Sequence, residues 1–166
     1  MGPPVNKLST LVAKINGSSL PSFLRQAALS TAFNAQVKMA GVSGIHIKSL
    51  TDSQSIVKLK NTFRVQNHIG GVHACGMALL AESASGMVFG MNVKDSHLPL
   101  LKSMSMKYVK RAKGDLKAIA TLTDAQRNEI LSADKGDVLV NVVLTDEDGN
   151  SPVEAEMCWA WVPKRK

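Results

Sequence analysis

Hydrophobic positions early in the chain recur first with a helical period and then with the period of a strand. From Leu20 to Gly41 the spacing of apolar residues is helical, which predicts a leading helix. Residues 44–60 then alternate between apolar and polar, which predicts a β-hairpin around a polar turn at 51–53. On this alternation, Ser49 lies on the buried face of the first strand.

The longest apolar run, residues 72–89, is rich in Ala, Met and Leu and is too long for a strand. Apolar or small residues lie on every side of the helix it predicts, so we expect this helix to be buried all round. A short helix is predicted further on, where Thr123 and Gln126 form a capping-box pair. Four segments have strand character: 100–110, 114–122, 136–145 and 153–162.

Strands joined by hairpins predict an antiparallel sheet, and one very apolar helix predicts that the sheet wraps around it. We therefore expect a single α+β domain over residues 20–166, preceded by a flexible segment at 1–19. The composition, 45 % hydrophobic and 20 % charged, is typical of a globular chain. No stretch approaches the ~20 consecutive apolar residues of a transmembrane helix.

The net charge of +7 favours an anionic partner, unless it serves solubility alone. A nucleic-acid-associated dimer is one alternative, but aromatic residues make up only 4 % and do not interleave with the basic ones. A phosphate-bearing small molecule fits the charge as well. The first 51 residues contain five cations and no acid, as in organelle transit peptides. We expect a cytoplasmic protein, with mitochondria or another organelle as the alternative.

One charged residue, Glu82, interrupts the apolar helix. Burial of an unpaired carboxylate is costly, so such a residue is paired, lies at an opening or has a function. Two interpretations stay open: a catalytic acid, or a carboxylate neutralised by a cation such as Arg64. The two cysteines lack the spacing of a metal site, so we expect free thiols and no bound metal.

The residues before this helix favour the functional interpretation. A Gly70-Gly71 turn that leads into a helix leaves backbone N–H groups free to face a ligand, as an oxyanion hole requires. Asn67 is placed to orient a carbonyl or a water molecule. His73 precedes Glu82 by nine residues, about 180° around a helix, so one site can use both only if a second copy of the chain supplies one of them.

The stretch NHIGGVHACGMALLAE, residues 67–82, resembles the signature of hotdog-fold acyl-CoA thioesterases of the phenylacetate-degradation type. Asn67, His73 and Glu82 reproduce both spacings of that signature. The segment MSMKYVKRAKGDLKAIA, residues 104–120, resembles a strand pair of a little-characterised branch of these proteins. The resemblance covers roughly residues 40–162.

The resemblance implies a hotdog fold, in which the sheet wraps a central helix and two chains form one continuous sheet. It implies a homodimer or tetramer that hydrolyses an acyl-CoA thioester without a metal or redox cofactor. The N–H of Ala74 would bind the thioester carbonyl, and the partner's Glu82 would act as general base or nucleophile. Asn67 would place the water or the carbonyl, and His73 would shape the turn or take a direct part.

The resemblance also implies substrate-binding positions, with the basic ones near the phosphates of coenzyme A: Gly71, Ser103, Lys110, Arg111 and Lys113. Ser103 is the nearest match to a Ser or Thr of the better-known enzymes, and Leu101 competes for that position. Ala74 and Cys75 stand where those enzymes have Gly-Gly, and their side chains narrow the approach to the thioester. A hotdog protein that holds an acyl-CoA or another lipid without turnover is therefore the main alternative.

Overall fold

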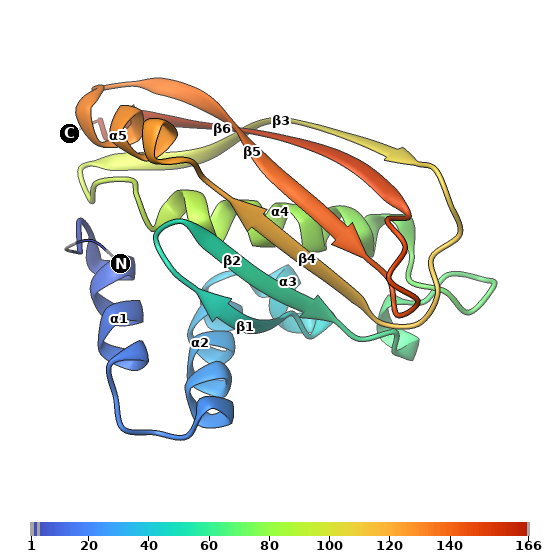
Figure 1. The fold of residues 1–166 in the computed structure, drawn as a ribbon. Coiled ribbons are helices and arrows are strands. Elements are labelled where there is room, and N and C mark those ends of the chain that lie inside the picture. The colour runs from blue at the N-terminus through green and yellow to red at the C-terminus, as the bar shows by residue number, and fades with distance from the viewer. Residues whose placement is uncertain (1, 3, 166) are drawn as a thin grey trace.

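The computed structural model describes residue 2 and residues 4–165, and Figure 1 shows its fold. Three helices come first: α1 (Lys7–Asn16), α2 (Ser22–Gln36) and α3 (Lys38–Ser43). Strands β1 (His46–Leu50) and β2 (Gln54–Leu59) lead through the 3-10 helix η1 (Phe63–Val65) into the long helix α4 (Ala74–Gly90). The remaining elements are β3 (His97–Tyr108), β4 (Leu116–Thr121), α5 (Asp124–Ser132), β5 (Gly136–Thr145) and β6 (Val153–Pro163).

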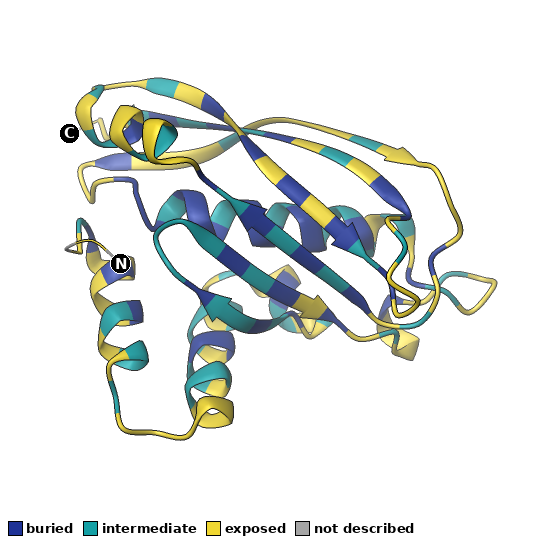
Figure 2. Cartoon of the chain, viewed as in Figure 1, coloured by how far each residue is buried: buried dark blue, intermediate teal, exposed yellow. Residues whose placement is uncertain are grey.

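The six strands form one antiparallel sheet in the order β1-β2-β4-β5-β6-β3. Helix α4 packs against β2, β4, β5, β6 and β3, so the sheet wraps around it as predicted (Figure 1). Along β5 buried and exposed residues alternate, because one face packs on α4 and the other meets solvent (Figure 2). The hotdog fold expected from the sequence is confirmed.

The C-terminal half of α4 is held tightly against β6. Trp159 Nε1 donates a hydrogen bond of 2.9 Å to Ser85 Oγ, and the Trp159 ring stacks on Phe89 with centroids 5.6 Å apart. A Cβ at Gly86 would come within 2.7 Å of the same ring, so only glycine lets helix and strand approach this closely. The apolar residues of the helix therefore form the centre of the core.

The N-terminal segment differs from the prediction of a flexible stretch over 1–19, because residues 7–16 form helix α1. Asn6 and Ser9 form a capping box at its start. The Asn6 side chain also donates to the carbonyls of Gly90 (2.8 Å) and Val93 (2.5 Å), which ties α1 to the end of α4. A buried side chain that bonds across the molecule fixes the segment in place.

The predicted leading helix is present but divides into two. Helix α2 ends at Gln36, Val37 adopts an extended conformation, and α3 follows at once. A Cβ at Gly41 would lie 2.8 Å from the carbonyl oxygen of Asn34, so glycine permits the close packing at this break. Gly44 ends α3 with a φ of 73°.

The hairpin of β1 and β2 is confirmed, with one correction to its register. The pairing shifts between Ile47 and Ser49, which places Leu50 in the core at 2 % exposure and leaves Ser49 only partly buried. A β-bulge adds one residue to a strand and so reverses the alternation beyond it.

In the described part of the chain, no helix combines the length and apolarity needed to cross a membrane.

Candidate active site

The loop before α4 is organised by Asn67. Its Oδ1 accepts hydrogen bonds from the backbone N–H groups of Ile69 (3.0 Å) and Gly71 (3.1 Å). The backbone N–H of Asn67 donates to the Gly71 carbonyl at 2.8 Å. Gly70 takes a φ of 76° at the tip. The Asn67 oxygen is thus committed to the loop, and the Nδ2 group is the part of this side chain left to meet a ligand.

His73 is the N-cap of α4. Its Nδ1 accepts a hydrogen bond of 3.1 Å from the N–H of Cys75, so the neutral ring carries its proton on Nε2. Among the described residues, the N–H groups of Ala74 and Gly76 have no hydrogen-bond partner. The start of the helix therefore keeps free N–H donors at the positive end of its dipole, as an anion site requires.

Glu82 is partly buried and has no cationic partner, because no described Lys, Arg or His lies within ion-pair distance of its carboxylate. The interpretation in which Arg64 neutralises it is therefore wrong for the single chain. Burial disfavours the charged form and raises the pKa of Glu82. A half-buried, unpaired carboxylate with a raised pKa is typical of a functional site.

The direction in which Glu82 points follows from helix geometry. Ser85 and Phe89, three and seven residues further on, share its side of α4, and both contact Trp159 of β6. Glu82 therefore faces the part of the sheet where β6 meets the edge strand β3.

Strand β3 points apolar side chains toward α4. Met104 pairs with Met157, whose side chain is buried toward α4, so Met104 faces α4 as well, yet it is 53 % exposed. Leu101 pairs with Trp159 and also faces inward. The face of β3 that points toward α4 is thus apolar and stays partly exposed.

The predicted substrate-binding residue Ser103 lies on the face of the sheet that points away from α4 in the single chain. The pairing of β3 with β6 shifts between Leu101 and Ser103, and Ser103 pairs with Cys158 on the outer face of the sheet. The bulge reverses the alternation, so the inward position belongs to the competing residue, Leu101.

Three of the predicted substrate-binding residues lie together. Gly71, Arg111 and Lys113 line one surface cavity beside the loop of Asn67. An Arg111 terminal nitrogen donates to the Ile69 carbonyl at 3.3 Å, which ties the cationic segment to this loop. Lys113 pairs with Asp148 at 2.8 Å, and this hydrogen bond raises the pKa of the lysine.

The third predicted cation, Lys110, lies apart from that cavity. Its Nζ donates to Asn150 Oδ1 at 2.6 Å, in the turn between β5 and β6. The structure therefore brings together only part of the predicted phosphate-binding group.

Tyr108 is a residue of this region that the sequence prediction missed. Its hydroxyl donates a hydrogen bond of 2.9 Å to the carbonyl of Ala74, and partial burial raises the pKa of its phenol. The contact joins the end of β3 to the first turn of α4. Two signals could have found it: Tyr108 is the chain's one tyrosine, and it lies within the segment 104–120.

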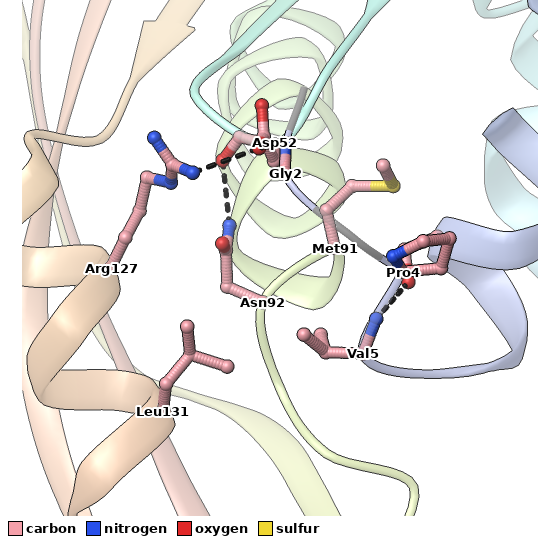
Figure 3. A pocket seen from close by; sticks show the side chains of 9 residues that line it. Gly2, Pro4, Val5, Asp52, Met91, Asn92, Arg127 and Leu131 are labelled. Atoms are coloured by element: carbon pink, nitrogen blue, oxygen red, sulfur yellow. Dashed lines mark hydrogen bonds and ion pairs between the residues drawn. The ribbon is translucent and has the colours of Figure 1, made fainter.

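A second cavity, shown in Figure 3, lies at the other end of α4. Arg127 of α5 pairs there with Asp52 and with Asp124, each at 2.8 Å. Asn92 donates to the Asp52 carbonyl at 2.7 Å. This cavity contains none of the predicted site residues, and its cation is already neutralised by two carboxylates.

Within one chain the two halves of the predicted site stay apart. Ala74 and Glu82 are eight residues apart on α4, which corresponds to about 12 Å along the axis. Among the described residues, no group of three His, Cys, Asp or Glu is placed to hold a metal ion.

Comparison with known proteins identifies the family. A family model described as a domain of unknown function, DUF4442, matches residues 25–162. The chain belongs to this family. The comparison of this DUF4442 protein with curated proteins gave no match.

Solved structures of similar shape support the hotdog assignment. A Pseudomonas aeruginosa protein, PA5026, described as a "Probable Thioesterase", is 22 % identical with a TM-score of 0.73, over 87 % of this chain and 97 % of that chain. The thioesterase HI1161 of Haemophilus influenzae is 11 % identical with a TM-score of 0.65, over 81 % and 90 % of the two chains. At these identities the likeness shows the fold.

Proposed function

We propose that this DUF4442 protein hydrolyses an acyl-CoA thioester at a site built from two copies of the chain. One copy supplies the start of α4, with the Ala74 N–H, Asn67 and His73, and the other supplies Glu82. The observation that carries the proposal is Glu82, which is the only charged residue of α4 and has no cationic partner in the described chain. The thioesterase names of similarly folded proteins support the reaction class.

Strand β3 is the element through which we expect two copies to pair. It is 12 residues long, lies at the edge of the sheet and carries exposed apolar residues such as Leu100 and Met104. A long open edge is a template for a further strand, and pairing β3 with its copy would continue the sheet with twofold symmetry. The resulting homodimer, or a tetramer of two such dimers, would place a second α4 near the inward face of β3.

The proposed chemistry needs only groups that the two chains hold. The Glu82 carboxylate takes a proton from water as the oxygen attacks the thioester carbonyl, and the Ala74 N–H stabilises the oxyanion that forms. When the intermediate collapses, the C–S bond breaks and the Glu82 carboxyl returns its proton to the thiolate. A raised pKa suits Glu82 to this role, because it makes the carboxylate a stronger base. Direct attack by Glu82 on the carbonyl is the alternative route. No cofactor is required.

The substrate is expected to enter with its phosphates at the cationic loop. Gly71, Arg111 and Lys113 line a cavity next to the Asn67 loop and offer an anion site within the same copy that supplies the oxyanion donor. Lys110 would contribute only by leaving Asn150. The acyl chain would then lie along the inward face of β3, beside Leu101 and Met104.

One observation favours the alternative of a binding protein without turnover. The Cys75 N–H, a candidate second oxyanion donor, is already taken by His73 Nδ1. With Ala74 as the principal donor, the site would hold a thioester but stabilise the transition state less well than a two-donor oxyanion hole.

The experiment follows thiol release from a panel of acyl-CoAs by the purified protein. We expect release by the native chain and a loss of about 10²–10⁴-fold in Glu82→Gln. The matched control is Glu156→Gln, because Glu156 is exposed on the outer face of the sheet, away from α4. Acyl-CoA binding without release would favour the binding protein, and equal activity of the two variants would contradict the proposed base.

A further inference from the structure

Helices α2 and α3 present apolar residues to solvent where a surface helix is normally polar. The exposed residues of α2 include a row spaced four positions apart, Phe23, Ala27, Thr31 and Ala35. Helix α3 also exposes large apolar residues, Met39 at 61 % and Val42 at 64 %, and Phe23 of α2 is 65 % exposed. Most of the surface of these side chains remains exposed in the fold, so it is available to a partner.

A fourth large apolar residue is exposed close to α3. Phe63 of η1 is 90 % exposed and lines a surface cavity together with Val42 of α3. We call Phe23, Met39, Val42 and Phe63 the helical patch. The start of α2 and the turn that precedes it, which carries exposed Leu20, lie at the bottom of Figure 2 and are exposed.

The charge around the helical patch is mainly positive, although Asp115 lies close by and accepts a hydrogen bond of 2.9 Å from the N–H of Asn61. Residues 1–81 contain a single acid, Asp52, which is largely buried and paired with Arg127. The same stretch contains eight cations and so accounts for the whole net charge of +7: Lys7, Lys14, Arg25, Lys38, Lys48, Lys58, Lys60 and Arg64. Lys60 and Arg64 line the cavity beside Phe63, and Lys38 is exposed next to Met39.

The helical patch lies away from the edge through which we expect two copies to pair. Helix α2 packs on β1, and β1 and β3 are the two opposite edges of the sheet. Pairing through β3 would therefore leave the patch open. Its exposed apolar surface is not explained by the proposed dimer.

We propose that the helical patch docks this protein on an anionic lipid surface. Exposed apolar side chains flanked mainly by Lys and Arg match a layer that is apolar below and negatively charged at its surface. A second copy of the same face is a poorer partner, because twofold contact would bring like charges together. A nucleic acid would match the charge but would offer no apolar layer to Phe23, Met39 and Phe63.

The test measures co-sedimentation of the full chain with vesicles. Phosphatidylcholine vesicles are compared with vesicles that contain about one third phosphatidylglycerol. We expect binding to the anionic vesicles that is at least about tenfold stronger than to the neutral ones and that weakens as salt is raised. The variant Phe23→Ser/Met39→Ser/Phe63→Ser is expected to lose this binding by a similar factor.

Two further variants make the result specific. Leu139→Ser/Val143→Ser removes apolar residues of comparable exposure from the outer sheet face and should bind anionic vesicles as the native chain does. Lys38→Glu/Lys60→Glu tests the charge without touching apolar side chains and should weaken binding. Thermal unfolding checks that each variant is folded.

Several results would overturn the proposal. These are equal binding to both kinds of vesicle, native-like binding by the triple serine variant, or no binding at all. A change of oligomeric state in vesicle-free buffer on mutation of the patch would assign it to self-association instead. Binding of a short duplex that depends on the patch would assign it to nucleic acid. Thiol release is measured separately, so failure here leaves the proposed hydrolysis untouched.

Discussion

The two halves of α4 are built from similar residues but differ in how completely the rest of the chain packs against them. In the C-terminal half, Ser85, Gly86 and Phe89 all meet Trp159, and the helix is closed against the sheet. In the N-terminal half, the Ala74 N–H has no partner, Glu82 has no counter-ion, and the facing Met104 is half exposed. One helix thus serves as the core at one end and presents unsatisfied groups at the other. We infer that the second end is completed by another molecule.

Beside the loss expected for Glu82→Gln, removal of the Ala74 N–H should have a large effect on the activity of the open half. Proline is well tolerated at the first position of a helix, and His73 before it already has an extended conformation, so Ala74→Pro should fold normally. We expect thiol release to fall about 10²–10³-fold, as when an oxyanion donor is lost. Ala74→Gly keeps the N–H and is the control, so equal activity of the two variants would argue against this donor.

Bulk added to the closed half should affect stability rather than chemistry. Gly86→Ala places a methyl group against the Trp159 ring, whereas Gly90→Ala meets only ordinary contact with Leu8. Both variants replace a glycine of α4 by alanine, so the gain in helix propensity cancels when they are compared. The free energy of unfolding in urea should therefore be about 1–3 kcal/mol lower for Gly86→Ala than for Gly90→Ala. Two equally stable variants would mean that the packing of α4 on β6 is looser than described.

How far the sequence predicted this molecule can be judged from the same two halves. The burial of α4, the strands around it and the α5 capping box were predicted, because they depend on local period and capping that the chain repeats consistently. The misplaced residues, Ser49 and Ser103, both follow a β-bulge. A bulge reverses the faces of a strand, but it depends on the partner strand and leaves no period of its own.

For the site, spacing alone predicted that Glu82 and His73 lie on opposite sides of one helix, because that follows from the helical repeat. The cation group was predicted only in part. Arg111 and Lys113 join Gly71 at one cavity, but Lys110 is held by Asn150 from a distant turn. The contact between Lys110 and Asn150 depends on how the hairpins pack together, so the local sequence does not predict it. Helix α1 was missed for the same reason, since the long-range bonds of Asn6 hold it in place.

The pH dependence should separate Glu82 from ordinary surface acids. Its pKa is raised in the folded chain, so between the unfolded value of about 4.3 and the raised value the folded state holds more protons. The stability of the native chain should therefore fall relative to Glu82→Gln as the pH rises through that window. Urea unfolding at matched protein concentration over a pH series measures this difference, and a difference that does not vary with pH would contradict the burial of the carboxylate.

The same protonation should control activity. A general base acts only when deprotonated, so kcat/KM should rise with pH until Glu82 is ionised and then level off.

The smallest effect is expected at Tyr108, whose hydroxyl donates to the Ala74 carbonyl on a half-exposed surface. Tyr108→Phe should lower the free energy of unfolding by about 0.5–1.5 kcal/mol and should lower kcat by a few fold. Unchanged kcat would show that the contact does not position the start of α4.

The most direct test of the central claim mixes two inactive variants. Glu82→Gln retains the oxyanion donor and Ala74→Pro retains the acid, so a site made across two chains has one intact copy in each mixed dimer. Random reassortment of the two proteins should then restore about one quarter of native thiol release, because half of the dimers are mixed and each has one working site of two. A mixture that stays as inactive as its components, although mixed dimers are shown to form, would contradict a site shared between two chains.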